Sequence, residues 1–252
     1  GKGAFIGGIP ADLKGDVSLR GVAMAIAQPF VQAMNLDLPS DIGPTLDAGV
    51  KLATVSGGPS SAAPPLDVDI TVGSQHLNVS GAVRYAKDMV KTRGDGITVN
   101  AARAATMAGR FLAPDARFRI WRSKPDVKGL TLRITSLEAP MLPGGQPDMK
   151  KLTGDIDISL EGAALVPVVN GKPETSKSLV AESLNIKALL TPGGGLKSNI
   201  MGKMWSEVAF FDVVGNLTAL DLLTNGKDGA PGVALDMMKP DGTIELRNVP
   251  VN

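Results

Sequence analysis

The chain has 252 residues, of which 43% are hydrophobic and 20% charged, so it holds enough apolar material for a core and global disorder is excluded. The formal net charge of +1 argues against a nucleic-acid binder that works by neutralising phosphates. Because there is no cysteine, a disulfide frame and a thiolate metal site are excluded too. The 30 glycines and 18 prolines indicate many turns and few long helices.

The chain contains no apolar run that approaches the roughly 18 residues needed to cross a bilayer. It begins with Gly1 rather than an initiator methionine. We therefore expect it to be part of a longer protein, so the lack of an anchor here does not make the parent protein soluble.

The first third of the chain begins with an alternating strand over residues 13–21, bounded by glycine. Residues 22–35 have apolar side chains spaced by four, and Pro29 must either kink this helix or start a new one. The pattern predicts a short helix over residues 29–35, followed by a strand over 46–56.

Residues 66–72 and 76–85 predict a β-hairpin that turns at residues 73–75. Apolar side chains occupy one face of both strands and polar side chains the other. Gly81 interrupts the apolar face and is a candidate bulge position. A second hairpin is expected over residues 90–104, with its turn at 94–96.

The second half predicts further strands over residues 116–122, 129–137, 180–191, 196–204, 207–214 and 216–223, with a last pair around 240–242. A short helix over 161–169 is possible, limited by Pro167. The Gly/Pro-rich loop from Pro140 to Pro147 is the best domain boundary, giving units 1–139 and 148–252. Residues 152–162 repeat the L-x-G-D start and closing glycine of residues 13–21, so a mainly β chain with long-period internal repetition is expected.

Two segments, PFVQAMNLDLPSDIGPTLDAGVKL and LDVDITVGSQHLNVSGAVRY, resemble the repeat of the AsmA-like proteins of the Gram-negative envelope. That repeat combines a short helix, an L-x-L-P step and alternating strands with a glycine. The resemblance is clear over residues 9–113 and generic from 114 onward. The matching positions are Leu36, Leu38, Pro39, Leu46, Val50, Leu77, Gly81 and Val83.

The resemblance implies a long, curved antiparallel sheet that forms a U-shaped groove with one or two short helices. It also implies a non-enzymatic segment of a periplasm-spanning lipid-transfer protein, which carries phospholipid between the inner and outer membranes, works with membrane proteins of the envelope and needs no cofactor or metal. The inner-membrane anchor of such proteins would lie in a segment absent from this chain. The expected groove lining is Leu66, Val68, Ile70, Val72, Leu77, Val79, Val83, Leu130, Leu132, Ile134, Ile156 and Ile158.

The same alternation fits a closed β-sandwich, in which a second sheet covers the apolar face. Such a module would act in adhesion or in outer-membrane protein biogenesis. The pattern alone favours the closed core, whereas the resemblance favours the groove.

Candidate catalytic groups are few. The pairs Asp67/Asp69 and Asp155/Asp157 have a spacing that a glycosidase might use, but they fit the solvent face of alternating strands better. His76 is the only histidine, and one histidine without cysteine makes neither a convincing metal site nor a catalytic triad. We therefore predict no catalysis and no metal site.

Two side-chain clusters remain. Arg117, Arg119 and Arg122 surround Phe118 and Trp121, and they are candidates for contact with lipid headgroups or a partner, against the simpler reading of a solvated strand. An apolar concentration further on fits a flexible ligand lining or, more simply, core packing. Its members are Met201, Met204, Trp205, Phe210 and Phe211.

Overall fold

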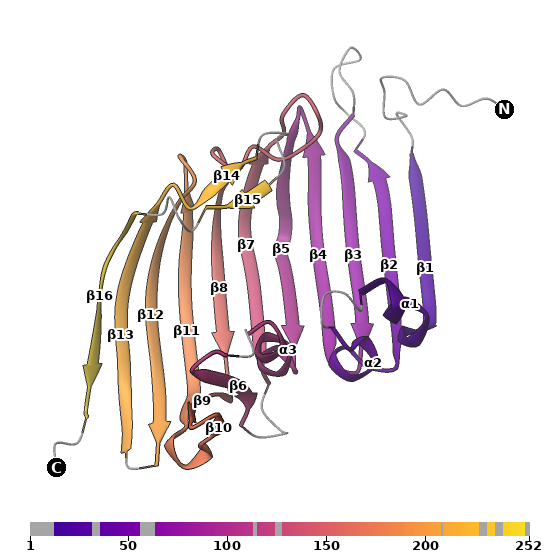
Figure 1. The fold of residues 1–252 in the computed structure, drawn as a ribbon. Helices are drawn as coiled ribbons and strands as arrows, with labels where there is room; N and C mark the ends of the chain where they lie inside the picture. Colours follow the sequence, from indigo (N-terminus) through magenta and orange to yellow (C-terminus); the bar gives the residue numbers. More distant parts are fainter. Residues whose placement is uncertain are drawn as a thin grey trace.

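The computed structural model describes residues 13–31, 36–55, 64–112, 115–123, 128–207, 209–226, 231–234 and 239–249. These residues form a 14-stranded antiparallel sheet, a separate two-stranded sheet and a few short helices (Figure 1). The helices are α1 (Met24–Val31), α2 (Leu38–Asp41), α3 (Ala104–Arg110) and a 3₁₀ turn (Thr175–Lys177). None of the helices in these ranges is long and apolar enough to cross a membrane.

The strands of the first half are β1 (Lys14–Ala23), β2 (Thr45–Thr54), β3 (Leu66–Ser74), β4 (Leu77–Ala86), β5 (Met89–Ala101), β6 (Phe118–Arg122) and β7 (Leu130–Pro140). Those of the second half are β8 (Thr153–Leu160), β9 (Ala163–Val169), β10 (Lys172–Pro173), β11 (Leu179–Thr191), β12 (Gly195–Ser206), β13 (Ala209–Leu220), β14 (Leu223–Asn225), β15 (Pro231–Val233) and β16 (Lys239–Arg247).

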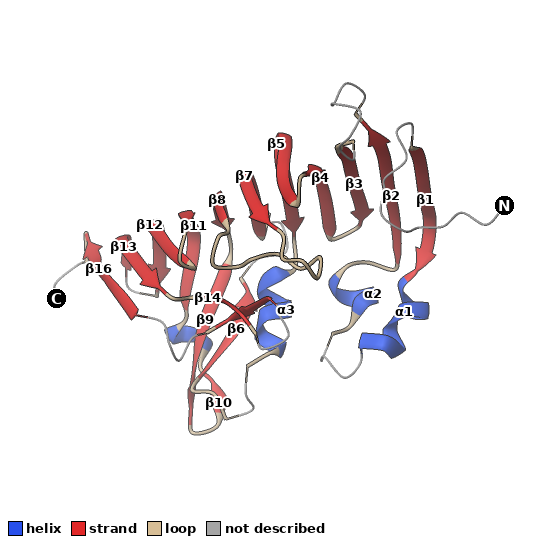
Figure 2. Cartoon of the chain, turned by 90° about the horizontal axis from the view of Figure 1, so that it is seen from above, coloured by secondary structure: helices blue, strands red, loops and turns tan. Residues whose placement is uncertain are grey.

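The large sheet is open. Its strands follow the order β1-β2-β3-β4-β5-β7-β8-β11-β12-β13-β16, and within the described residues β1 and β16 each pair on one side only. The mainly β fold with one long antiparallel sheet is therefore confirmed. Figure 2 shows the sheet from above, with the helices and the small lobe of β6, β9 and β10 on one side of it. β7 and β8 pair directly across the loop predicted as the domain boundary.

The predicted hairpin of residues 66–72 and 76–85 is formed by β3 and β4, with Val72 opposite Val79. In the pairing of β4 with β5 the register shifts between Gly81 and Val83, where residues 93–96 of β5 lie opposite Ala82 alone. β4 itself pairs with β3 without interruption, so the bulge lies in β5, opposite the predicted position. A Cβ atom at Gly81 would lie 3.0 Å from Cγ1 of Ile97, so this glycine makes room for the opposite side chain.

The second predicted hairpin, over residues 90–104, is wrong. Residues 89–101 are one strand, β5, and the glycines at 94 and 96 form a bulge in it rather than a turn. Val90 and Thr92 face the same side as Ile97 and Val99, although Thr92 and Ile97 are five positions apart and an odd step would put them on opposite sides of a regular strand. The bulge therefore shifts the alternation by one residue, so that Val90 in the first half of β5 faces the same side as Ile97 and Val99 in the second half.

Four other local predictions need correction. Helix α1 covers Met24–Val31 with Pro29 inside it, rather than starting there, and residues 32–35 lie outside the described residues. The possible helix over 161–169 is strand β9, since its backbone pairs with β6 and β11. The strands predicted at 207–214 and 216–223 are mostly one strand, β13, and residues 240–242 lie inside β16 instead of in a turn.

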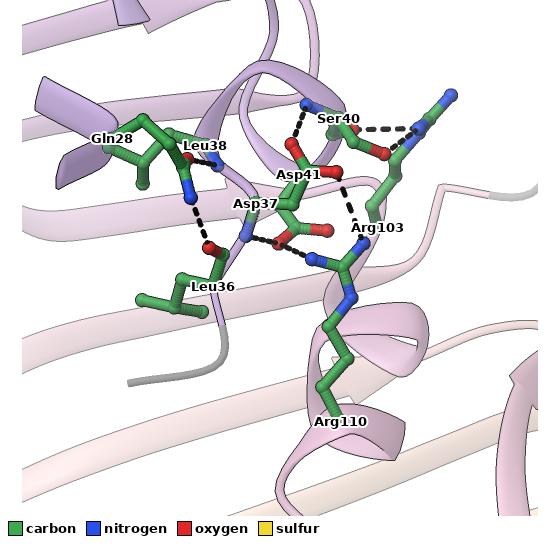
Figure 3. Close-up of polar contacts among 8 residues, drawn as sticks. All are labelled: Gln28, Leu36, Asp37, Leu38, Ser40, Asp41, Arg103 and Arg110. Atoms are coloured by element: carbon green, nitrogen blue, oxygen red, sulfur yellow. Dashed lines mark hydrogen bonds and ion pairs between the residues drawn. The ribbon is translucent and has the colours of Figure 1, made fainter. Parts of the chain in front are cut away.

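The helices lie at the end of the strands that is lowest in Figure 1, and polar contacts link them to one another there (Figure 3). The Gln28 side chain bridges to the backbone before α2, donating to the Leu36 carbonyl and accepting from the Leu38 N–H. Asp41 is buried, and its Oδ2 accepts from Arg110 of α3 at 2.8 Å and from the Asp37 N–H at 2.9 Å. Because residues about 70 positions apart meet here, these contacts fix α2 against α3.

The bulge gives the first test of the fold. Gly96 has a φ of +79°, and a Cβ atom there would collide with the carbonyl oxygen of Ile134. Gly94, in the same bulge, has a φ of +59° and nothing within 4 Å of its Cβ position. We expect Gly94→Ala to lower the free energy of unfolding by about 1 kcal/mol and Gly96→Ala by about 3 kcal/mol or more in urea titrations. Equal effects would contradict the described bulge geometry.

Candidate functional site

The candidate site is the apolar face of the large sheet, which the strand register assembles from all eleven strands of the main path. Residues that are Cα partners in neighbouring strands point to the same side of a sheet. Following these partners gives one continuous row with no polar side chain. It consists of Leu19, Ala48, Val72, Val79, Val99, Leu132, Ile158, Ile186, Ile200, Gly215 and Ile244.

Two parallel rows widen this apolar band. The row above it has one polar member, Ser198, whose hydroxyl donates to the Leu217 carbonyl at 3.4 Å; its members are Val17, Val50, Ile70, Gly81, Ile97, Ile134, Ile156, Ala188, Ser198, Leu217 and Gly242. The row below is Leu77, Ala101, Leu130, Leu160, Leu184, Gly202, Val213 and Leu246. We call these three rows the aliphatic face.

The opposite face is polar in the corresponding row, which is Ser18, Gly49, Thr71, Ser80, Thr98, Arg133, Asp157, Lys187, Asn199, Asn216 and Thr243. Leu189 and Met201 are exposed apolar exceptions on this side. One side of the sheet is thus suited to water and the other to an apolar environment.

The aliphatic face is only partly covered within the described residues. In its first row Gly215 is the one buried residue, and Leu19 and Ile244 at the two edges are 56% and 70% exposed. The larger buried cluster, Ala139, Leu152 and Leu190, lies at the upper end of the strands, where Met149 and Leu223 pack against it. A closed sandwich would instead bury such rows between two sheets.

Nine of the twelve residues predicted to line a groove lie in the three rows of the aliphatic face, and Leu66, Val68 and Val83 point to the same side of β3 and β4 beyond these rows. Ile70 is exposed and the other eleven are half-buried. The prediction did not include Ile186, Ile200 and Ile244, which extend the first row through β11, β12 and β16. The alternation of these strands was visible in the sequence, but the pairing that continues the row from β8 through β11, β12 and β13 to β16 was not.

The carboxylate pairs lie on the polar face, as predicted. Asp67 accepts two hydrogen bonds from Arg84, at 2.6 and 2.9 Å. Arg93, which comes from the β5 bulge, reaches across β4 to form ion pairs with Asp67 and Asp69. The hydrogen bond from Arg84 lowers the pKa of Asp67 from its ordinary value, and the charges of Arg84 and Arg93 add to this. These carboxylates stabilise the sheet.

His76 lies at the hairpin between β3 and β4, and its backbone N–H donates to the Ile42 carbonyl at 2.8 Å. Burial, followed by the charges of Arg103 and Arg122, lowers the pKa of this imidazole. In the described part of the chain no group of three or more acidic, histidine or cysteine side chains is placed to hold a metal ion.

The three predicted headgroup-contacting arginines do not share one face. Arg119 and Arg122 lie three positions apart on β6, so alternation sends them to opposite sides of the strand. Arg119 donates to the carbonyls of Ala116 and Phe118. Arg117 is exposed just before β6, and Arg122 lines a cavity described below.

Alternation also divides the apolar concentration near residue 205. Met204 and Phe211 are Cα partners on the side of the aliphatic face, whereas Trp205 and Phe210 are partners on the opposite side. The Trp205 and Phe210 ring centroids are 6.5 Å apart. The cluster therefore contributes to both faces.

A scan of protein-family models gave no match to this chain, and neither the curated proteins nor the solved structures gave a significant one.

The Asp67–Arg84 pair predicts a pH dependence. Because the folded protein lowers the pKa of Asp67, this carboxylate stabilises the fold above its unfolded pKa near 3.8, and the stabilisation is lost as the pH falls through the lower folded value. We expect Asp67→Asn to be less stable than wild type at neutral pH and to lose less further stability upon acidification. Urea titrations across this range measure both effects.

The control is Asp16→Asn. In the wild-type protein Asp16 forms a long ion pair with Lys51, at 4.0 Å, and both side chains are exposed. We expect this substitution to change stability by at most about 0.5 kcal/mol at neutral pH. If both variants had the same acid dependence as wild type, the described Asp67 contacts would not contribute to acid stability.

Proposed function

We propose that the aliphatic face holds lipid acyl chains, and that this chain is a non-enzymatic segment of a protein that carries phospholipid across the periplasm between the inner and outer membranes. The observation that supports this most is the unbroken first row of the aliphatic face, which crosses eleven strands without a polar side chain.

The energetics of lipid transfer require such continuity. Each CH₂ group removed from water is worth about 0.8 kcal/mol, so exposing a sixteen-carbon chain costs roughly 13 kcal/mol. A protein that moves a lipid must therefore keep its acyl chains in an apolar environment at every point of the path. A polar gap in the path would raise a barrier at that point, and the first row has none.

The dimensions of the face suit acyl chains. Neighbouring strands lie about 4.8 Å apart, so the ten spacings between β1 and β16 make an apolar path of roughly 48 Å. Rows two residues apart along a strand are separated by about 6.7 Å, so three rows give a band of roughly 13 Å between their outer lines. Acyl chains would lie across the strands, with the headgroups toward water.

The chemistry of the lining favours a mobile ligand over a fixed one. Val, Leu, Ile, Ala and Gly side chains present no hydrogen-bond donors or acceptors, so they fix neither the position nor the chain length of a lipid. Aromatic residues are only 4% of the chain. A smooth aliphatic floor lets a lipid slide, which is what transfer requires.

The resemblance to AsmA-like proteins supports the same proposal. It implies a location in the periplasm, attachment to the inner membrane and envelope proteins at both membranes as partners. The competing sandwich module in adhesion or outer-membrane protein biogenesis would need a second sheet over the aliphatic face. Within the described residues the second sheet consists of β14 and β15 alone, and it contacts the buried cluster at one end of the strands through Leu223.

A charge in the first row tests the proposal. We expect Val79→Asp to weaken binding of a fluorescently labelled phospholipid by at least about tenfold, because a carboxylate beside acyl chains is costly to desolvate. Equilibrium titration of the purified chain measures the affinity, and circular dichroism checks the fold. Val79 is half-buried, so the sheet should remain folded.

Ser80→Asp is the matched control, because Ser80 is the next residue of β4 and is exposed in the polar row. We expect this variant to bind lipid as wild type does. Equal binding by all three proteins would refute the proposed site. Global unfolding of the Val79 variant alone would instead indicate that the aliphatic face is the inside of a closed core.

A further inference from the structure

A cavity lies away from the aliphatic face, where β6 and β9 meet the ends of β11, β12 and β13. It has a volume of about 580 Å³, within the usual range for small-molecule sites. Trp121, Trp205 and Phe210 line it. The lipid-binding proposal does not use these residues.

The strand register explains how distant aromatic residues meet there. Trp121 is the Cα partner of Ala164, Ala164 of Val180, Val180 of Trp205, and Trp205 of Phe210. These residues form one row across five strands, with large aromatic side chains at both ends and the small side chains of Ala164 and Val180 between them. Trp205 lies five positions from Ile200 on β12, so the row is on the side opposite the aliphatic face.

The floor and the walls of the cavity differ in burial. Ala164, Val166 and Val180 form a buried cluster beneath it. Trp121, Trp205 and Phe210 are 41%, 39% and 62% exposed, so their rings stand at the solvent instead of filling a core. Three strand spacings, roughly 14 Å, separate the backbones of Trp121 and Trp205. The small floor between the two indoles therefore leaves a slot with an aromatic wall on each side.

The rest of the lining is polar and of mixed charge. Arg122 and Glu182 both line the cavity, together with the hydroxyl-bearing side chains of Ser123, Thr175 and Ser178. The guanidinium only donates hydrogen bonds, the carboxylate only accepts them, and hydroxyls do both. This set can satisfy a ligand that has many donors and acceptors.

These features narrow the ligand class. Arg122 and Glu182 carry opposite charges, so their attraction and repulsion of any single ion oppose each other and the lining favours neither an anion nor a simple cation. An acyl chain offers no hydrogen-bonding groups to the charged and hydroxyl side chains of the lining, and it would partly remove them from water. A neutral sugar ring fits both the aromatic walls and the polar lining. Its C–H faces pack on aromatic rings, and the hydroxyl groups around its edge can exchange hydrogen bonds with the polar side chains. We propose that this cavity binds a ring of a neutral carbohydrate.

The chain offers a built-in reporter for this site, because Trp121 and Trp205 are its only two tryptophans. The experiment titrates the purified chain with cellobiose, maltose, lactose and diacetylchitobiose while tryptophan emission is recorded. We expect at least one of these neutral disaccharides to change the emission saturably. Decanoate and tetramethylammonium serve as anionic-apolar and cationic probes, and we expect neither to compete with the sugar.

Phe210→Ala keeps both tryptophans and removes one exposed ring of the wall. We expect it to weaken sugar binding about three- to tenfold, the usual range for one aromatic contact. Phe111→Ala is the matched control, since Phe111 is 60% exposed and does not line the cavity. It should bind the sugar as wild type does. Val79→Asp should also leave sugar binding unchanged, which separates this site from the aliphatic face.

The proposal is overturned if none of the four disaccharides gives a saturable change. It is overturned equally if decanoate or tetramethylammonium saturates the signal and no sugar does, or if the two phenylalanine variants bind alike. None of these outcomes bears on lipid binding at the aliphatic face.

Discussion

The structure depends on one constraint, which is that the register of every strand must put its apolar side chains on the same side of the sheet as those of its neighbours. In a β-strand a slip of one residue moves every side chain to the other face. A single error of register would therefore place aspartate and lysine in the apolar band. Eleven consecutive strands avoid this, so that a row of aliphatic side chains runs from Leu19 to Ile244.

The irregularities of the sheet serve this constraint. The β5 bulge after Thr92 lets the two halves of a long strand, whose apolar positions are out of phase in the sequence, face the same side. A register shift in β7 between Ile134 and Ser136 does the same for Leu137 and Ala139. Arg93 uses the β5 bulge to reach Asp67 and Asp69, so the irregular segment is held by ion pairs on the polar face. Backbone pairing and these lateral contacts stabilise a layer that has little buried core of its own.

The sequence predicted those parts of the fold that depend on neighbouring residues. Alternation over residues 66–85 predicted the β3–β4 hairpin and its two faces, whereas the bulge expected at Gly81 lies in the neighbouring strand β5. It failed where local signals were ambiguous. The Gly94–Gly96 segment has the composition of a turn, and only pairing with β4 and β7 keeps it in one strand. Residues 163–169 have a composition compatible with a helix, and their pairing with β6 makes them a strand.

The candidate sites show the same division. The common side of the twelve residues predicted to line a groove could be predicted, because period-two alternation fixes the face of each one. The aromatic cavity was not, because Trp121 and Trp205 are brought together by the pairing of β6, β9, β11 and β12, which no local pattern encodes. The sequence showed only that Trp205 and Phe210 belong to an apolar cluster. Their common side follows from the register of β12 with β13.

The central claim is that the aliphatic face contacts lipid, and photocrosslinking in cells tests it most directly. A photoreactive amino acid is placed in the protein at Ile134, on the aliphatic face, or at Arg133, the preceding residue on the polar face. Lipids attached to the protein after irradiation are identified by mass spectrometry. The account predicts phospholipid adducts at position 134 and few at 133. Adducts to protein alone at position 134, or equal lipid labelling at both positions, would contradict it.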